Sequence, residues 1–243
     1  AAEAGANLKK SALELGGNDA FLILEDADFE LLKDTIFFAR LYNAGQVCTS
    51  SKRFIVVGEE NYKKFLDMVV ETFKTAKWGD PMDPETTLAP LSSAEAKEEV
   101  LGQIKLAADN GARVVYGNKP IDHPGNFVFP TVLTDITKEN PIYNQEIFGP
   151  VASIYKVDTE EEAIALANDS SYGLGGTVFS KDLEHAKAVA AKIETGMTFI
   201  NSGWSSYPEV PFGGIKNSGY GRELSNLGFD AFVNEHLVFI PKQ

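Results

Sequence analysis

Residues 151–201 read VASIYKVDTEEEAIALANDSSYGLGGTVFSKDLEHAKAVAAKIETGMTFIN and alternate between two hydrophobic patterns. Three short runs, VASIYKV, GGTVFS and MTFIN, are rich in β-branched and aromatic residues and predict strands. The stretches between them, EEEAIALAND and DLEHAKAVAAKIE, space their apolar residues as helices do. Alternating strands and helices favour an α/β domain with a mostly parallel sheet and helices on both faces.

The same alternation continues toward the N-terminus. Further strands are predicted in DAFLILED at residues 21–24, in RFIVVG from Arg53 and in ARVVYG. Predicted helices, with apolar side chains every three or four positions, cover residues 29–42, 62–73 and 96–107. The connectors 78–91 and 117–130, rich in Pro with Asp or Gly, predict surface loops within one domain.

Composition limits the partners that we expect. The 243 residues carry 22 basic and 35 acidic side chains, a formal charge of −13, and no basic run suited to a phosphate backbone. No apolar run approaches the roughly 20 residues that span a bilayer. With a single cysteine and no signal peptide, the sequence predicts a cytoplasmic protein that binds neither nucleic acid nor membrane.

The chain begins with AAEAGANLKK, which is typical of the second half of an amphipathic helix. It has no N-cap and no starting methionine. We therefore expect the sequence to have been cut from a longer one.

The only cysteine, Cys48, lies in YNAGQVCTSS, residues 42–51. A lone cysteine is usually a small buried hydrophobic residue. Cys48, however, directly follows a predicted helix and is expected on a loop, where reactive groups are commonly presented. A Cys-His hydrolase and a metal site are disfavoured because the histidines are expected at the surface, without metal-ligand spacing; they are His123, His185 and His236.

Two glutamates remain as partners for a nucleophilic thiol. Glu14 lies in LELGGND directly before Gly16 and Gly17, which permit a close backbone approach. Glu146 lies in NQEIFGP, next to Phe148. An isolated glutamate is normally a solvated charge, so these residues indicate a site only in combination with Cys48.

This combination resembles the aldehyde dehydrogenase superfamily. Its base, nucleophile and cofactor-ribose motifs are similar to LELGGND, NAGQVCTSSKRFIV and NQEIFGPV, and its C-terminal signature is similar to PFGGIKNSGYGRE. The four motifs have the family's order and spacing over nearly the whole chain. Within the superfamily, ELGGND, LILEDAD and the ending GRELSNLGFDAFVNEHLVFI look most like bacterial succinate-semialdehyde dehydrogenases.

The resemblance implies a mechanism. The thiolate of Cys48 would attack an aldehyde, hydride would pass to NAD or NADP, and Glu14 would activate the water that hydrolyses the thioester. Glu146 would bind the nicotinamide ribose and Phe148 would brace the nicotinamide. The cofactor site would also include Leu15 and Gly16.

The resemblance also implies that half of the family's chain is missing. Relatives are about twice as long, and their N-terminal half carries the dinucleotide-binding domain and the asparagine that completes the oxyanion hole with the N–H of Cys48. No strand-GxGxxG-helix unit occurs here. We therefore expect residues 1–235 to form the catalytic domain and 236–243 to form a C-terminal oligomerisation strand, with a homodimer or homotetramer at full length.

The substrate is expected to be succinate semialdehyde or a similar short-chain aldehyde. Enzymes for this substrate often hold its carboxylate with an arginine six residues before the nucleophile, where this chain has Tyr42. Arg40 is expected to face elsewhere. The resemblance places the substrate pocket at Tyr42, Trp204, Ser205 and Ser206, with Tyr207 beside them.

Two alternatives stay open. In a coenzyme A-acylating dehydrogenase a thiol, not water, resolves the thioester; such relatives generally lack the base, so the presence of Glu14 argues against this reading. Alternatively, the chain as given is a non-catalytic module for folding and assembly, because it lacks a cofactor domain and has an apolar C-terminal strand that could pair with another chain.

Overall fold

The computed structural model describes residues 1–242, which form a seven-stranded sheet. In spatial order its strands are β4 (Arg113–Tyr116), β5 (Thr131–Thr134), β6 (Val151–Val157), β3 (Ser51–Val57), β2 (Asp19–Ile23), β8 (Gly175–Phe179) and β9 (Met197–Ile200). Every neighbouring pair is parallel except β4 and β5, which are antiparallel. The prediction of a mostly parallel α/β sheet is confirmed.

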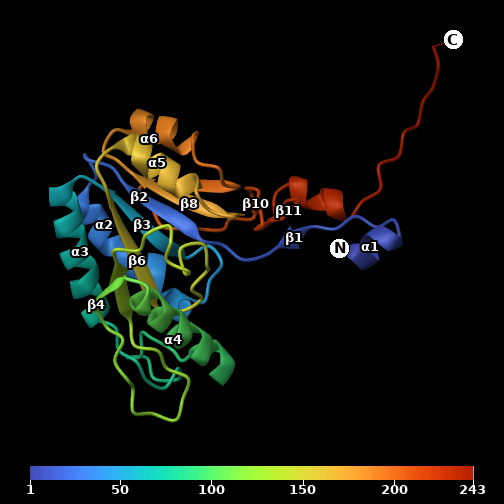
Figure 1. The fold of residues 1–243 in the computed structure, drawn as a ribbon. Coiled ribbons are helices and arrows are strands. Elements are labelled where there is room, and N and C mark those ends of the chain that lie inside the picture. Colours follow the sequence, from blue (N-terminus) through green and yellow to red (C-terminus); the bar gives the residue numbers. More distant parts are fainter. Residues whose placement is uncertain (243) are drawn as a thin grey trace.

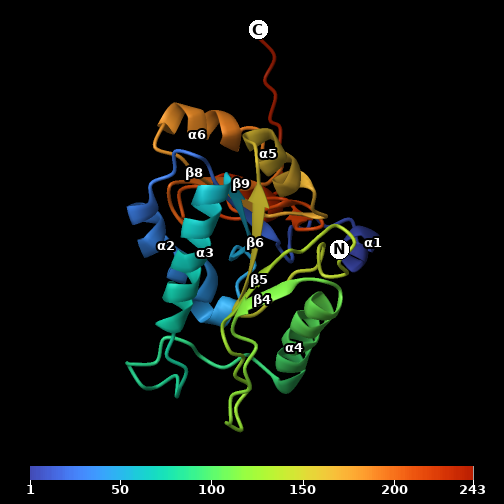
Figure 2. The same ribbon diagram turned by 60° about the vertical axis from the view of Figure 1, so that its left-hand side comes forward.

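Helices cover both faces of this sheet. They are α2 (Phe29–Leu41), α3 (Glu59–Lys74), α4 (Ala94–Asp109), α5 (Glu160–Asn168) and α6 (Leu183–Ala190). The chain moves from β2 to β3 in one direction along the sheet, and from β6 to β8 and β9 in the other. Because parallel crossovers are right-handed, α2 and α3 lie on the face opposite to α5 and α6 (Figures 1 and 2).

Polar side chains cap the start of α2, α4, α5 and α6. Asp28, Ser93, Thr159 and Asp182 each accept a hydrogen bond from a backbone N–H in the first turn. The central strands β2, β3 and β8 are buried along their whole length, as strands covered on both faces must be. Phe21 lies at the centre of the core, with its ring centroid 5.1 Å from Phe54 and 4.9 Å from Phe179.

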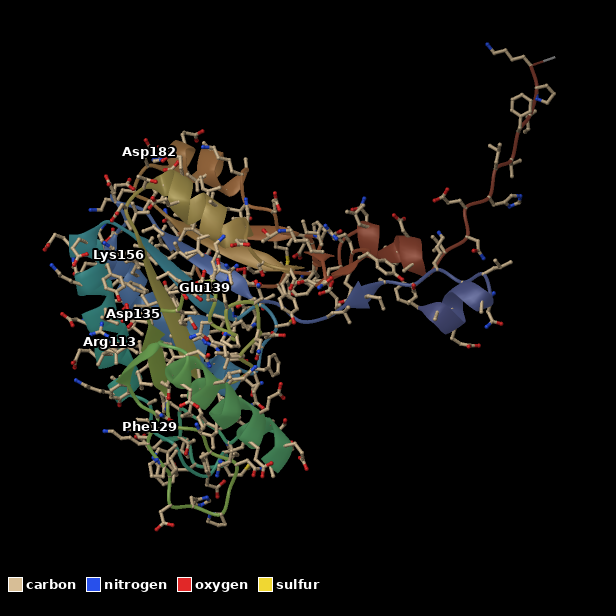
Figure 3. All side chains as sticks on the ribbon, viewed as in Figure 1. Arg113, Phe129, Asp135, Glu139, Lys156 and Asp182 are labelled. Carbon is tan, nitrogen blue, oxygen red and sulfur yellow. The ribbon has the colours of Figure 1, made fainter. Side chains whose placement is uncertain are left out.

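The edge formed by β4 and β5 differs most from the prediction. The sequence pattern did not indicate β5, because four residues after a proline-rich connector show too little periodicity. Arg113 on β4 and Asp135 after β5 lie together at this edge, where they form an ion pair of 3.2 Å (Figure 3). The connectors 78–91 and 117–130 contain no helix or extended strand and pack together through Trp78 and Phe127, with centroids 5.5 Å apart.

Both ends of the chain project from the body of the fold (Figure 1). Two small antiparallel pairs lie near them: β1 (Leu13–Glu14) with β11 (Gly219–Tyr220), and β7 (Tyr172–Gly173) with β10 (Ile215–Lys216). The helix α1 (Ala2–Ala6) and the 3₁₀ helix η2 (Leu227–Ala231) flank the first pair.

The expected C-terminal strand, residues 236–243, forms no strand within the described part of this single chain. Residues 236–242 extend away from the body with exposed side chains, and Gln243 lies outside the described residues. Among residues 1–242, no helix is both long enough and apolar enough to cross a membrane.

Candidate active site

The candidate residues come to one edge of the sheet because each lies in the segment that leads into one of three adjacent strands. Glu14 precedes β2, Cys48 precedes β3 and Glu146 precedes β6, and these strands are neighbours in the order β6-β3-β2. The amino ends of parallel strands share one edge of the sheet. The topology therefore brings together side chains that are far apart in the sequence.

An unusual backbone turn presents Cys48. After α2 ends, Asn43, Ala44 and Gly45 adopt positive φ angles of 51°, 54° and 75°. A Cβ on Gly45 would lie 2.2 Å from the carbonyl oxygen of Gly149, so a side chain cannot be accommodated there. A turn closed by a hydrogen bond from the N–H of Ser50 to the carbonyl of Val47 follows, and it leaves Cys48 half-buried immediately before β3.

Arg40 supports this turn from below. It is fully buried, and its guanidinium donates to Ser50 Oγ and to main-chain carbonyls of two loops, those of Gly45, Ile147, Gly149 and Val151. Burial lowers the pKa of Arg40 to about 9, and the charge of Glu146 opposes this shift. Arg40 therefore joins the loop before β3 to the loop before β6.

Gly16 and Gly17 form the close approach between the three loops. A Cβ on Gly16 would lie 2.4 Å from Glu146 Oε2, and a Cβ on Gly17 would lie 2.4 Å from the carbonyl oxygen of Cys48. Leu15, between Glu14 and this pair, is 49% exposed and donates its N–H to the carbonyl of Ser218. The two glycines thus allow the segment after Glu14 to approach the loops that carry Cys48 and Glu146.

Replacing Gly17 with alanine tests this packing. The new methyl group would collide with the backbone of Cys48, so we expect the free energy of unfolding to fall by about 1–3 kcal/mol. Gly102→Ala is the matched control, because Gly102 is exposed inside α4 with open space around it, and alanine there should add up to about 1 kcal/mol. Urea unfolding measures both, and equal effects would contradict the packing described.

The carboxylate of Glu14 is buried without a partner. Among the described residues, neither of its oxygens accepts a hydrogen bond. Burial raises the pKa of Glu14, and the carboxylate of Glu223 raises it further. The N–H of Gly214, near but outside hydrogen-bonding geometry, and the charge of Arg222 offset part of this shift. Glu14 therefore keeps free lone pairs and an increased basicity.

The thiol of Cys48 responds to several charges. Burial raises its pKa, the ammonium of Lys52 and the N–H of Thr49 lower it, and the carboxylates of Asp19 and Glu14 raise it. The effect of Glu14 places that carboxylate within electrostatic range of the thiol. No group of three metal-ligating side chains occurs among residues 1–242.

Tyr42 and Trp204 lie together beside this turn. Phe38, Tyr42 and Trp204 form an aromatic cluster with centroids 5.0–5.9 Å apart, and Tyr42 is 52% exposed. Ser205 and Ser206 instead line a hollow beside β9, together with Tyr207 and Phe212. The structure thus joins two of the four predicted pocket residues in one cluster and places the other two in a neighbouring hollow.

Comparison with known proteins assigns the family. A family model described as the aldehyde dehydrogenase family matches residues 1–238. The chain belongs to the aldehyde dehydrogenase family. The resemblance identified from the four motifs is confirmed, and so is the fold that it implied.

Relatives within the aldehyde dehydrogenase family are similar over nearly the whole chain. Curated succinate-semialdehyde dehydrogenases [NADP(+)] from Deinococcus radiodurans and Mycobacterium avium are 48% and 45% identical over 97% and 99% of this chain. These matches cover 49% and 51% of the relatives, so the chain spans about half their length.

Solved structures of family members have the same fold as this chain. A succinic semialdehyde dehydrogenase from Streptococcus pyogenes in complex with NADP+ is 70% identical, with a TM-score of 0.97 over 99% of this chain and 53% of that one. A betaine aldehyde dehydrogenase from Staphylococcus aureus in complex with NAD+ is 38% identical, with a TM-score of 0.89 over 94% and 46%.

Two charged residues of this aldehyde dehydrogenase chain escaped the sequence analysis. Lys52 lies at the start of β3 and Asp19 at the start of β2, and both are buried beneath Cys48 and Glu146. The available signal was a charged residue at the start of a strand that is otherwise largely apolar. Such a residue is rarely buried without a partner.

Proposed function

We propose that this chain is the catalytic half of an NAD(P)+-dependent aldehyde dehydrogenase that oxidises succinate semialdehyde or a similar short-chain aldehyde to the carboxylate. The observation that carries the proposal is that the thiol of Cys48 and the buried carboxylate of Glu14 lie within electrostatic range of each other, in the segments that lead into the adjacent strands β3 and β2. A thiol and a buried carboxylate with free oxygens are the nucleophile and base that thioester chemistry requires.

Cys48 begins the reaction. Its thiolate attacks the carbonyl carbon of the aldehyde, forming a carbon–sulfur bond and leaving the former carbonyl electron pair on oxygen. The backbone N–H of Cys48 is the donor that this chain offers to the oxyanion. Loss of hydride from the same carbon restores the carbonyl and leaves a thioester on Cys48.

Glu14 completes the reaction. Its ionised carboxylate removes a proton from water as the water attacks the thioester, and the carbon–sulfur bond then breaks to release the carboxylic acid and the thiolate. The raised pKa of Glu14 strengthens it as a base relative to a solvated carboxylate. The free lone pairs of both its oxygens are available to orient the water.

Glu146 suits a sugar with free hydroxyl groups. Its Oε1 is buried 3.0 Å from the ammonium of Lys52 and accepts no well-aligned hydrogen bond among the described residues, so acceptor capacity remains. Phe148 is 43% exposed, as a surface that braces a flat ring must be. These two residues, with Leu15 and Gly16, would hold the nicotinamide end of NAD(P)+. When bound, that cofactor supplies the hydride acceptor.

Succinate semialdehyde is favoured by the names of the relatives in Deinococcus, Mycobacterium and Streptococcus. Arg40 and Arg53 are both buried and bonded to main-chain carbonyls, so neither is placed to hold the distal carboxylate. Polar groups around Tyr42, Trp204, Ser205 and Ser206 are the candidates from this chain.

A comparison of two substrates tests the substrate class. In the complete protein, with this chain joined to its cofactor-binding half, kcat/KM for succinate semialdehyde should exceed that for butanal by at least about 100-fold, because a site built for a polar group rejects its apolar analogue. Steady-state rates of NAD(P)H formation measure this ratio. Equal kcat/KM values would rule out succinate semialdehyde as the preferred substrate but would still be consistent with aldehyde oxidation. Formation of an acyl product that depends on coenzyme A would overturn the hydrolytic mechanism.

The proposal includes assembly and location. Residues 1–235 act as the catalytic domain, and 236–243 add a strand to a neighbouring subunit in a homodimer or homotetramer. The exposed apolar side chains of Leu237, Val238, Phe239 and Ile240 support this pairing. A free cysteine without a disulfide suits the reducing cytoplasm.

A further inference from the structure

Lys52 is a buried lysine that donates two hydrogen bonds and forms an ion pair with Glu146. Its side chain is 3% exposed, and its ammonium lies 2.8 Å from the carbonyl oxygen of Val47, 2.7 Å from that of Cys48 and 3.0 Å from Glu146 Oε1. A lysine ammonium has three N–H donors. One side chain therefore holds both the backbone of the nucleophile turn and the carboxylate of the loop before β6.

The charges around Lys52 come from several strands. Burial lowers the pKa of Lys52; the carboxylates of Glu146 and Asp19 oppose this shift, and the charge of Arg40 adds to it. Asp19 is itself buried on β2, and its Oδ1 accepts a hydrogen bond of 3.1 Å from the N–H of Gly175. Burial raises the pKa of Asp19 to about 6, with Lys52 opposing the shift, so this carboxyl is ionised when a thiol titrates.

Burying the ammonium of Lys52 costs desolvation free energy. A residue that only held the two main-chain carbonyls in place would not need a charge. A neutral donor such as glutamine could bond the two main-chain carbonyls without the desolvation cost of a charge. The thiol of Cys48, by contrast, benefits from a positive charge, because burial and the carboxylates of Asp19 and Glu14 all oppose its ionisation. Lys52 supplies that charge.

We propose that Lys52 is a positioning residue for the nucleophile: its ammonium fixes the Val47–Cys48 carbonyls and supports the Cys48 thiolate against the carboxylates of Asp19 and Glu14. The proposal rests on the proposed function in that the thiolate is the attacking group. Lys52 acts through Cys48 and needs no contact with the aldehyde.

The test is the pH dependence of Cys48 alkylation by iodoacetamide in the complete protein, without cofactor or aldehyde, read by mass spectrometry. Lys52→Met removes the charge, and Lys52→Gln removes it while keeping a hydrogen-bond donor. Both should raise the midpoint by about one pH unit or more, which lowers the alkylation rate about tenfold at neutral pH. Lys105→Met, at an exposed lysine on α4, should change nothing.

Asp19→Asn gives an independent result of opposite sign. The amide oxygen can still accept the hydrogen bond from Gly175, but one opposing charge is lost, so the midpoint should fall. The double variant with Lys52→Met should lie between the two single variants. A midpoint unmoved by Lys52→Gln, or an upward shift in Asp19→Asn, would overturn the proposal. Because no turnover is measured, this result is separate from whether the protein oxidises aldehydes.

Discussion

Cys48→Ala is expected to reduce aldehyde oxidation in the complete protein by at least about 10⁴-fold, as loss of a nucleophile does elsewhere. The alanine removes the only atom in this chain's site that can form the thioester, while Glu146 and Phe148 stay in place. Cofactor affinity should therefore remain near that of the unmodified protein. The measurements are NAD(P)H formation by absorbance and cofactor binding by calorimetry.

The control for Cys48→Ala is to show that the variant still folds. The side chain is half-buried at a turn, so a change to alanine should leave the circular dichroism spectrum unaltered and the melting temperature nearly so. Turnover that persists in a folded Cys48→Ala protein would contradict the proposed function directly.

Glu14→Gln is expected to separate the two halves of the reaction. Glutamine fills the same space but cannot accept the proton from water, so thioester hydrolysis should slow by about 10²–10⁴-fold while the thioester still forms. A rapid burst of one NAD(P)H per site, followed by a slow steady state, is the signature in stopped-flow absorbance. Glu3→Gln, at an exposed glutamate on α1, should behave as the unmodified protein.

The proposed role of Glu14 also predicts the direction in which the rate of thioester hydrolysis changes with pH. The carboxylate form of Glu14 is the base, so hydrolysis should rise with pH through the pKa of Glu14, which burial places above its ordinary value of 4.5. This rising limb should vanish in Glu14→Gln. A burst without a slow phase, or an unchanged limb, would show that another group activates the water.

Hydrophobic periodicity was sufficient to predict most of the sheet and its covering helices. The helix α3 was predicted because its apolar residues repeat over several turns. The strand β6 was predicted because it is a long run of mostly apolar residues, as in strands covered on both faces. The four-residue strand β5 was missed, and its place is set by pairing with β6 and β4 instead of by its own pattern.

The strand order could not be predicted from periodicity. That order alone explains why Glu14, Cys48 and Glu146 share an edge, and it puts them at the amino ends of the strands. Many open α/β sheets bind ligands at the opposite, carboxyl edge. Here the motif resemblance, not a general rule for the fold class, identified the candidate residues.

Only part of the candidate site could be predicted, because some of its residues come together only through tertiary contacts. Cys48 and Glu14 stand out by residue type and motif, whereas Lys52 and Asp19 matter through tertiary contacts that a strand pattern does not record. Trp204 packs on Phe38 and Tyr42, which lie on a helix and turn far earlier in the chain. Such long-range packing has no local signal.

Trapping the thioester tests the proposed roles of Cys48 and Glu14 together. Complete protein carrying Glu14→Gln is mixed with succinate semialdehyde and NADP+, quenched in acid within the burst, digested and analysed by mass spectrometry. One acyl group of the substrate is expected on the peptide that contains Cys48, and hydroxylamine should remove it. A burst of NADPH with no acyl group on Cys48, or with the acyl group on another residue, would contradict these roles.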